Sequence, residues 1–360
     1  MASSGLLLSS FVIVPTLMLL GFIPCRNIKQ IRTVAVIGAV IEIILALTLL
    51  FMFYAERNAG NTAEMLFMFD AVWYQATHIS VHYAIGADGI SVLMILLTSV
   101  IILTGTFASW KMDPLPKHFF MWLTLLSIGV YGFFISIDMF TMFFFYEIAL
   151  IPMYLLIGLW GTGKKEYSAM KLTLMLMGGP AFLFVGILGI YFYSSTTGDY
   201  TFNILEIAHN NVIPPSAQYW IFPLTFLGFG VLGALFPFHT WSPDGHASAP
   251  TAVSMLHAGV LMKLGGYGCF RIAMRLLPDA ANELSWIFII LTGISVIYGA
   301  LGAISQTDLK YINAYSSVSH CGLVLFAILM MNQTAMTGAV MQMLSHGLMT
   351  ALFFALIGMI

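Results

Sequence analysis

Ionisable residues lie inside long apolar stretches of this sequence, and their types are those that transfer protons. An ionisable residue inside a membrane helix costs at least about 2.5–3.5 kcal/mol on insertion scales, so its presence indicates a function. A lone buried histidine, by contrast, is often only a hydrogen-bonded core residue. The residues in or beside these stretches are Glu42, Glu147, Lys171, Lys263, His239, His257, His320 and His346.

Among these residues, Glu147 has the fewest possible environments. It lies in FFFYEIALIPMYLLIGLW, with at least eight residues of apolar sequence on each side, so its short side chain cannot reach the membrane surface. Its carboxyl group must be neutral, paired or exposed to water inside a bundle. The alternative is a structural hydrogen bond between helices. Pro152, five residues on, loosens the local backbone hydrogen bonding.

The two lysines and Glu42 leave different alternatives open. Lys263 lies mid-stretch in HAGVLMKLGGYG, and a lysine removed from water can accept and release a proton, as a relay requires. Lys171 is only three or four residues inside its stretch, so it could also extend to the surface. Glu42 lies among isoleucines in an early stretch with no other polar cluster. For Glu42, packing against a neighbouring subunit and a proton-transfer function are equally supported.

Polar residues recur at helical spacing in the last two apolar stretches. The first stripe has spacings of three, four and three, which place it within an arc of about 80° on one helix face; it comprises Lys310, Asn313, Ser317 and His320. The second stripe comprises Gln342, Ser345, His346 and Thr350. One stripe could simply hold helices together. Two stripes that each carry a histidine, which titrates near neutral pH, indicate a hydrated path for protons.

The stretch LGALFPFHTWSPDGHASAP at 232–250 cannot form one straight helix. Pro237 and Pro243 each lack a backbone donor, and Pro243-Asp244-Gly245 is a turn signal. A helix broken at membrane depth persists only where protein or a cavity covers the freed backbone, and such breaks often mark ion sites. Alternatively, the span ends at residue 241 and 242–249 is a short loop. Both can be true, with the helix broken at Pro237 and the chain leaving the membrane at Ser242.

Composition defines the class of protein. Hydrophobic residues make up 60% of the 360 residues and charged residues 8%, against about 25% charged in soluble domains. These values predict an all-α, polytopic membrane protein and exclude soluble enzymes, nucleic-acid binders and disulfide scaffolds. A net charge of −2 suggests no polyanionic partner. Three widely spaced cysteines form no haem, iron–sulfur or metal motif, so we expect no metal and no cofactor on this chain.

We predict eleven membrane spans and one long connection. Residues 56–84, which mix acidic and aromatic side chains, are expected to pack over the membrane surface as a loop or a short helix. The apolar end at 351–360 suggests a fragment of a longer protein. The predicted spans are 5–24, 33–55, 86–109, 119–137, 139–160, 168–193, 219–241, 250–274, 284–305, 308–330 and 334–360.

The distribution of charge predicts the orientation. Connections after odd-numbered spans carry most of the bases, and connections after even-numbered spans carry most of the acids, with Arg57 and Arg275 as exceptions. The positive-inside rule then places the N-terminus outside and residue 360 near the cytoplasmic side. The bases are Arg26, Lys29, Arg32, Lys111, Lys117, Lys164, Lys165 and Lys310.

Four motifs resemble one known family. FFFYEIALIPMYLLIGLWG, PFHTWSPDGHASAPTAVSMLHAGVLMKLGGYG, DLKYINAYSSVSHCG and QMLSHGLMTALFF are similar to the antiporter-like membrane subunits of NADH–quinone oxidoreductase, specifically chain M. The resemblance implies about 14 helices in two inverted five-helix repeats, each with a broken helix. The domains would be 1–110, a first repeat at 111–275 and an incomplete second repeat at 276–360. Related antiporter and hydrogenase subunits share these patterns.

The resemblance also implies roles for individual residues. Glu147 would modulate the charge of a partner lysine, and Lys263 would belong to the central proton-transfer axis. The remaining members of the implied path are Lys171, Lys310, His320 and His346, with His239, His257 and Glu42 as further candidates. Two positions depart from the family pattern. Leu232 stands where the family has the partner lysine, and Ala234 where it has a proline.

The expected function is proton translocation in the inner membrane of a bacterium. Redox energy would come from partner subunits, which the resemblance implies carry FMN, iron–sulfur clusters and a quinone site. Two alternatives remain. The chain could be a cation/proton antiporter subunit with no redox partner, or a structural paralogue that no longer conducts protons, as the absence of a lysine at 232 would favour.

Overall fold

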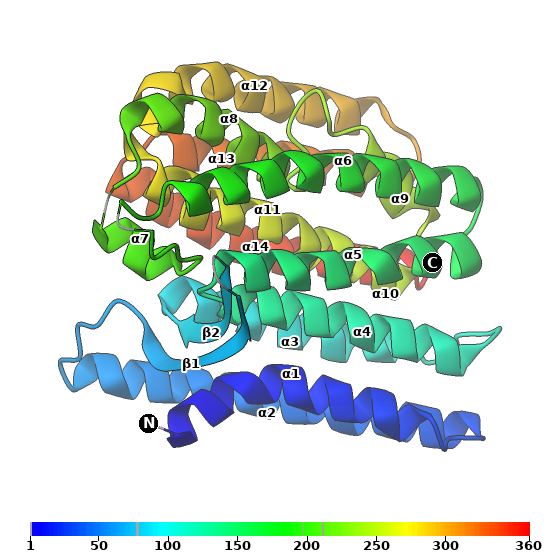
Figure 1. Cartoon of the computed structure of the whole chain (residues 1–360). Coiled ribbons are helices and arrows are strands. Elements are labelled where there is room, and N and C mark those ends of the chain that lie inside the picture. The colour runs from blue at the N-terminus through cyan, green and yellow to red at the C-terminus, as the bar shows by residue number, and fades with distance from the viewer. Residues whose placement is uncertain (1, 77–78, 197, 211) are drawn as a thin grey trace.

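Nearly parallel helices fill the computed structural model, which describes residues 2–76, 79–196, 198–210 and 212–360 (Figure 1). Within these residues, nine helices are long and apolar enough to cross a membrane. They are α1 (Ala2–Phe22), α2 (Ile28–Asn58), α3 (Gly89–Ala108), α4 (Pro116–Ile135), α5 (Met139–Trp160), α6 (Lys165–Phe192), α12 (Pro278–Ser305), α13 (Leu309–Leu329) and α14 (Gln333–Ile357). The all-α membrane bundle is therefore confirmed.

The other two predicted spans hold less regular elements. Range 219–241 covers most of α8 (Pro215–Leu232), which begins four residues earlier, and a short helix, α7 (Ile204–Asn210), precedes it. Range 250–274 contains α10 (Thr251–Leu256), the π-helical turn η1 (His257–Leu261), α11 (Met262–Gly268) and a second π-helical turn, η2 (Cys269–Met274). Almost every side chain from α10 to η2 is buried, so this segment forms the centre of the bundle. The count of eleven spans remains a prediction.

The stretch after α8 is interrupted at 233–240, which contains Pro237 as expected, whereas Pro243 lies inside the next helix. Helix α8 ends at Leu232, and the chain becomes helical again only in α9 (Trp241–Ser248). The prediction of a short loop at 242–249 is therefore wrong. Pro243 is the third residue of α9, where its missing N–H would have no partner within the helix in any case. The break begins at Gly233, followed by Ala234 in the left-handed region with φ of 56°.

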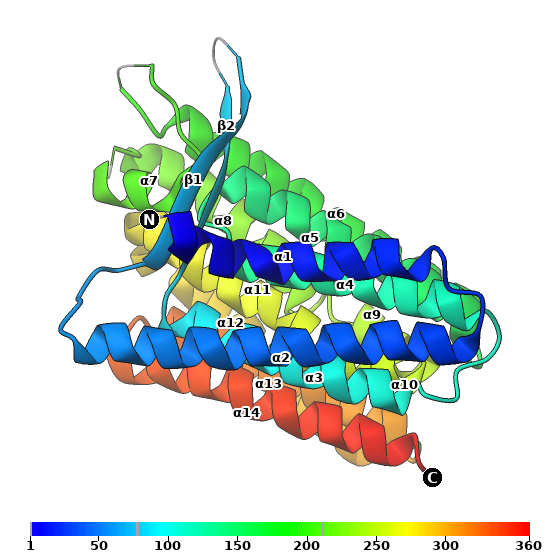
Figure 2. The ribbon, with the colours of Figure 1, turned by 90° about the horizontal axis from the view of Figure 1, so that it is seen from below.

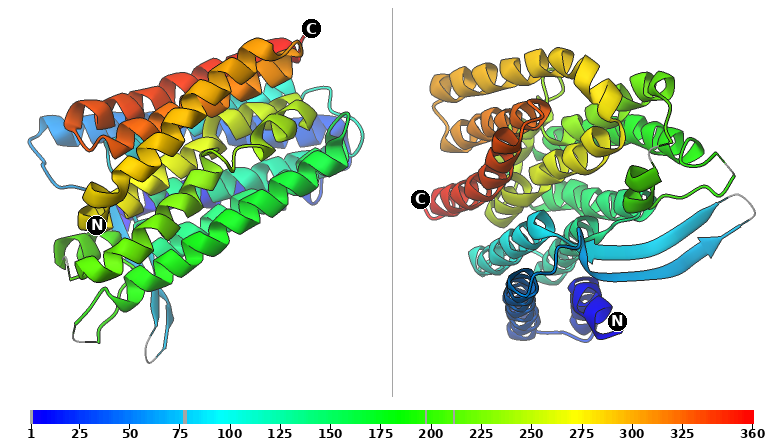
Figure 3. Two further views of the ribbon diagram at one scale, coloured as in Figure 1. Left: turned by 90° about the horizontal axis from the view of Figure 1, so that it is seen from above. Right: turned by 90° about the vertical axis from the view of Figure 1, so that its left-hand side faces the viewer.

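A β-hairpin replaces the loop or short helix expected at 56–84, so that prediction is also wrong. Helix α2 continues to Asn58, and β1 (Leu66–Gln75) then pairs in antiparallel register with β2 (Ser80–Ala87). The run LFMFDAVWYQ is rich in aromatic and β-branched side chains, which favour a strand once a partner strand satisfies its backbone. Residues 77–78 of the predicted loop lie outside the described part of the chain. The hairpin crosses one end of the bundle and projects beyond it (Figures 2 and 3).

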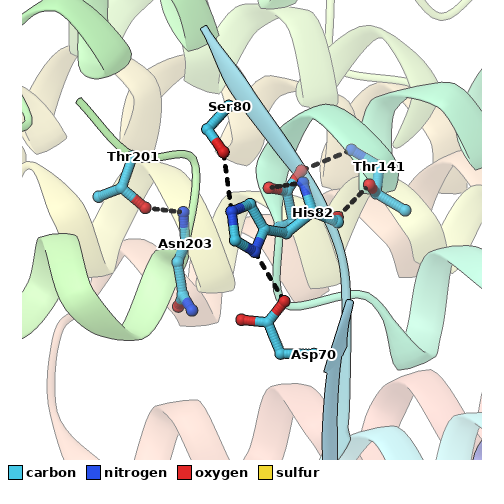
Figure 4. A network of polar contacts seen from close by, with 7 residues as sticks. Asp70, Ser80, His82, Thr141, Thr201 and Asn203 are labelled. Carbon is cyan, nitrogen blue, oxygen red and sulfur yellow. Dashed lines mark hydrogen bonds and ion pairs between the residues drawn. The ribbon is translucent and has the colours of Figure 1, made fainter. Parts of the chain in front are cut away.

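A polar network joins the hairpin to the start of α5 (Figure 4). The His82 ring lies between the Ser80 hydroxyl, at 2.8 Å, and the Asp70 carboxylate, at 2.7 Å. The backbone N–H of His82 donates to Asp138 at 3.3 Å, and the Thr141 hydroxyl donates to the carbonyl of His82 at 2.7 Å. Asp138 also caps α5 by accepting from the backbone N–H of Thr141 at 2.8 Å. One carboxylate therefore positions both the hairpin and the helix that carries Glu147.

A buried ion pair joins the other end of β2 to the central segment. Asp88 accepts from the backbone N–H of Ser91 at 2.9 Å, which caps α3, and also pairs with Arg271 of η2. The Ser91 hydroxyl lies 2.8 Å from the hydroxyl of Tyr267, which donates to the carbonyl of Phe134. These contacts hold α3, α4 and the central segment together at one level of the bundle.

Stability should depend on pH through Asp138. Its side chain is 1% exposed, and this burial raises the pKa of Asp138 from 3.8 to about 6, despite the hydrogen bonds that it accepts. Between about pH 4 and 6 the unfolded chain is ionised at this position while the folded chain keeps the proton. The free energy of unfolding should therefore fall by about 2–3 kcal/mol as the pH rises through this window. Thermal unfolding of the detergent-solubilised chain at several pH values would measure this.

The Asp138→Asn variant should lose that fall, whereas Asp113→Asn, at an exposed position, should retain it. A pH dependence identical in the wild-type chain and the Asp138→Asn variant would contradict the assignment.

Asp88→Asn should destabilise the chain much more than a matched change in an exposed ion pair. Asparagine can still cap α3, but it leaves the Arg271 guanidinium buried without a counter-charge, at a cost of about 3–5 kcal/mol. Glu64→Gln removes the partner of Arg275, and because Glu64 is 55% exposed this change should cost less than about 1 kcal/mol. Denaturant titration in detergent would compare the two variants. Equal losses would show that the Asp88–Arg271 pair does not hold these helices together.

Candidate functional site

Lys263 occupies the centre of the bundle, in α11, with 2% of its surface exposed. Its Nζ atom donates to the carbonyl of Ala258 and lies 2.7 Å from Nδ1 of His346 in α14. Ala258 belongs to η1, and π-helical turns of this kind often occur at functional sites. Among the residues that the structure describes, no carboxylate forms an ion pair with this ammonium group.

The histidine stripes of α13 and α14 meet beside Lys263. The rings of His346 and His320 lie 5.0 Å apart, and Nδ1 of His320 lies 2.8 Å from the side-chain amide of Gln342. His346 is buried and its Nε2 has no hydrogen-bond partner, whereas His320 is half-buried. Lys263, His346, His320 and Gln342 therefore form a connected row from the core toward a less buried position. We call it the Lys263 row.

The remaining residues of the two predicted polar stripes are not all buried. Asn313 and Ser317 are buried, and the Asn313 amide donates to the carbonyl of Thr350 at 3.4 Å, so the stripes do pack against each other. Ser345 is exposed, however, and does not belong to the inward face on which it was placed. Adjacent residues of a helix point about 100° apart, so Ser345 faces outward while the next residue, His346, faces inward.

Two predicted lysines hold the short helix α9 rather than joining the Lys263 row. Lys171 of α6 forms an ion pair with Asp244 at 2.6 Å, so it does not simply extend to the surface. Nζ of Lys310 donates to the carbonyls of Ala247 and Ala249, at 3.3 and 3.1 Å, near the end of α9. The Tyr311 hydroxyl donates to Asp244 at 3.3 Å. Helix α9 is therefore fixed from both sides by charged groups.

A second pair of histidines lies between α9 and the central segment. The rings of His246 in α9 and His257 in η1 are 4.3 Å apart, and both residues are at most 1% exposed. None of their four ring nitrogens has a hydrogen-bond partner among the described residues. Unpartnered buried polar groups are rare, so we expect these nitrogens to bind water or to have a function. Trp241 stacks on His257 at 5.2 Å. His246 was not singled out from the sequence, because it follows a Pro-Asp-Gly turn signal.

His239 and Glu147 stay apart from these contacts. His239 stacks on Phe236 and contacts the edge of Tyr298, and its Nδ1 atom is buried without a partner. Glu147 is half-buried, and its Oε1 also lacks a partner. No hydrogen bond or ion pair between described residues joins Glu147 to Lys263.

Leu232, at the position where the resemblance implies a lysine, is buried among apolar side chains. Leu232 is 0% exposed at the end of α8. A cavity of about 10 Å³ separates the break at Gly233 from Lys263, with otherwise apolar side chains and Cys321 around it. It offers space for at most one water molecule and no second charge.

Glu42 is buried within this chain, so of the two alternatives left open for it, peripheral packing against a neighbouring subunit is wrong. It is 2% exposed and borders a small cavity among α1–α4. It lies apart from the Lys263 row, and no described contact connects the two.

The sequence was compared with known proteins. Residues 136–360 match the sequence model of the family described as NADH:quinone oxidoreductase/Mrp antiporter, transmembrane. The chain belongs to this family. It is 35% identical over 336 residues to NAD(P)H-quinone oxidoreductase chain 4-2 of Synechocystis, covering 93% of this chain and 58% of that protein. It is also 32% identical over 341 residues to NADH-quinone oxidoreductase subunit M of Rhodobacter capsulatus, covering 92% and 64%.

Chains of two solved membrane complexes share the fold. A chain of respiratory complex I from Thermus thermophilus superposes with a TM-score of 0.85 at 24% identity, covering 99% of this chain and 71% of that one. A chain of the Mrp complex from Dietzia superposes with a TM-score of 0.78 at 19% identity, covering 99% and 65%. The chain spans less than two thirds of the length of the two curated family members above.

Lys171→Met should loosen α9. The change removes a half-buried ion pair and leaves Asp244 without its cation, at a cost of about 1 kcal/mol, which corresponds to about fivefold faster opening. Hydrogen–deuterium exchange at the α9 amides should accelerate by that factor, with little change in α1. Lys164→Met, at an exposed lysine, is the control. Unchanged exchange in α9 would mean that the Lys171–Asp244 pair does not hold this helix.

Proposed function

We propose that the chain is a proton-translocating membrane subunit of a bacterial NADH–quinone oxidoreductase. The observation that carries this proposal is the Lys263 row: a fully buried lysine, hydrogen-bonded to one histidine that lies 5.0 Å from a second. These side chains can each bind and release a proton, and their spacing allows transfer directly or through one water.

The mechanism depends on the mutual repulsion of charges along this row. Two unit charges 5 Å apart interact by about 3 kcal/mol at an effective dielectric constant of about 20. Moving one proton charge against 100 mV requires about 2.3 kcal/mol. A charge that arrives at one member of the row can therefore expel the proton from its neighbour. Lys263 would pass its proton toward His346 and His320, and redox energy from partner subunits would reset the row.

The histidine pair of α9 and η1 would connect Lys263 to the end of the bundle that carries most of the basic residues. Lys171 and Asp244 lie at one side of this pair, and the unpartnered nitrogens of His246 and His257 could be bridged by water. Glu147 would act only through space, because Leu232 replaces the lysine through which the family pattern connects it.

We also propose that the chain has redox-active partner subunits and a defined orientation in the membrane. Curated family members at 32–35% identity are named as chains or subunits of quinone oxidoreductases, which favours a redox-driven assembly over a free-standing antiporter. FMN, iron–sulfur clusters and the quinone would lie on other subunits. The end opposite the hairpin holds the loops with most of the bases (Figure 1), so it would face the cytoplasm and the N-terminus would lie outside.

Lys263→Met should lower the number of protons pumped per electron while the assembly persists. Methionine is apolar and similar in length, so it should fill the buried site, at the cost of the hydrogen bonds to Ala258 and His346. In inverted membrane vesicles the variant should still assemble and oxidise NADH, but the number of protons taken up per electron should fall. Lys164→Met is the matched control, since this lysine is exposed. A normal proton-to-electron ratio in Lys263→Met would refute the role of Lys263.

A further inference from the structure

The N-terminal helices contain a buried carboxyl group that the Lys263 row does not use. Glu42, in the middle of α2, has 2% of its surface exposed, and neither carboxyl oxygen has a hydrogen-bond partner. An ionised carboxylate left without a partner in an apolar interior costs several kcal/mol. Glu42 must therefore be neutral, or be stabilised by a donor or a cation that these contacts do not include.

A cavity lies against this carboxyl group. It measures about 10 Å³, close to the space that one water molecule needs. Helices α1–α4 all contribute to its wall, and the face of α2 toward the cavity carries only alanines at positions 39 and 35, one and two turns before Glu42. The polar residues around it are Thr106 of α3 and Thr124 and Ser127 of α4.

Two of the three hydroxyl groups around Glu42, those of Thr106 and Ser127, are arranged as acceptors. The Thr106 hydroxyl donates its hydrogen to the carbonyl of Ile102 at 2.8 Å, and the Ser127 hydroxyl donates to the carbonyl of Thr124 at 2.7 Å. A hydroxyl has one hydrogen to donate, so both groups offer Glu42 only lone pairs. Acceptors cannot stabilise a carboxylate, but they can accept the hydrogen of a neutral carboxylic acid.

Other charged or titratable groups near Glu42 do not neutralise it. Tyr131, one turn beyond Ser127 on α4, lies close enough to interact with a charge on Glu42, but its hydroxyl is already 2.8 Å from that of Ser99. Arg32 lies ten residues earlier on α2, about 15 Å away along the helix axis, where its guanidinium stacks over Trp110. Helix α1 has no ionisable side chain among its described residues.

We propose that Glu42 is a second proton-binding site, separate from the Lys263 row, in which a neutral carboxylic acid and one trapped water fill the cavity among α1–α4. The acid would donate to the water or to a hydroxyl oxygen, and the water would satisfy the second carboxyl oxygen. The site lies outside residues 136–360, which match the family, and it does not depend on the proposed pumping function.

Polar groups point to the route by which protons reach this site. Ser109, at the end of α3, is 2% exposed and its hydroxyl has no partner. It follows Thr106 by three residues and so lies near the same helix face. Both are closer to the end of the bundle that carries Arg32 than to the hairpin end. Proton exchange would therefore occur from that end.

Infrared difference spectroscopy of the intact chain in lipid would test the site. The wild-type chain should show the C=O stretching band of a buried carboxylic acid at neutral pH, shifted in D₂O. Glu42→Gln should remove this band and leave the thermal midpoint unchanged, because glutamine closely resembles the neutral acid. Glu147→Gln is the matched control, and the band assigned to Glu42 should persist in it. Persistence of every acid band in Glu42→Gln would overturn the proposal.

Two further measurements make the result decisive. If Glu42→Gln fails to fold, Glu42→Asp should shift the band rather than remove it, and an unshifted band would count against the assignment. The thermal midpoint of the wild-type chain should be the same in NaCl and in KCl. A midpoint raised selectively by Na⁺, and no longer raised in Glu42→Gln, would show that a metal cation rather than a proton occupies the site, which would also overturn the proposal.

Discussion

A buried ammonium group without a carboxylate partner is the constraint around which this bundle is organised. Lys263 has three N–H donors, and the structure gives it a backbone carbonyl and a histidine nitrogen, both neutral acceptors. Neutral acceptors satisfy hydrogen bonds but do not cancel charge. The stability of the charged lysine therefore depends strongly on every other charge nearby, and this sensitivity is what a proton relay requires. An ion pair between Lys263 and a carboxylate would have removed this sensitivity to nearby charges.

The irregular parts of the fold lie around Lys263 and allow α9 to pack against the central segment. Two π-helical turns flank α11, and the break after Leu232 lets the separate helix α9 approach the central segment. A continuous helix through residues 233–240 could not also present α9 to Lys171, Lys310 and η1. Backbone groups freed at membrane depth must be covered by protein. The buried surroundings of α9 provide this cover, and charged side chains from α6 and α13 hold the helix in place.

The sequence predicted the parts of the molecule that a bilayer dictates. Long apolar helices and the inward face with His320 and His346 follow from hydropathy and helical period alone. The hairpin was missed because aromatic and acidic residues outside the membrane carry no such period, and pairing between β1 and β2 is decided by contacts. Pro243 suggested a turn because a proline in the first turn of a helix looks the same as one in a loop. Glu42 could not be assigned, since one helix does not show what packs against it.

The replacement of the family lysine by Leu232 changes how charge can reach Lys263 in the proposed mechanism. Glu147 has no described hydrogen bond or ion pair to the row, and the cavity beside Gly233 has no charged side chain other than Lys263 in its wall. On the other side, His257 lies in the same central segment as Lys263 and 4.3 Å from His246 of α9, two residues after Asp244. Electrostatic influence weakens with distance and with intervening water. In the proposed mechanism, charge therefore reaches Lys263 through His346 on one side and from the His257–His246 pair on the other, and not through Glu147.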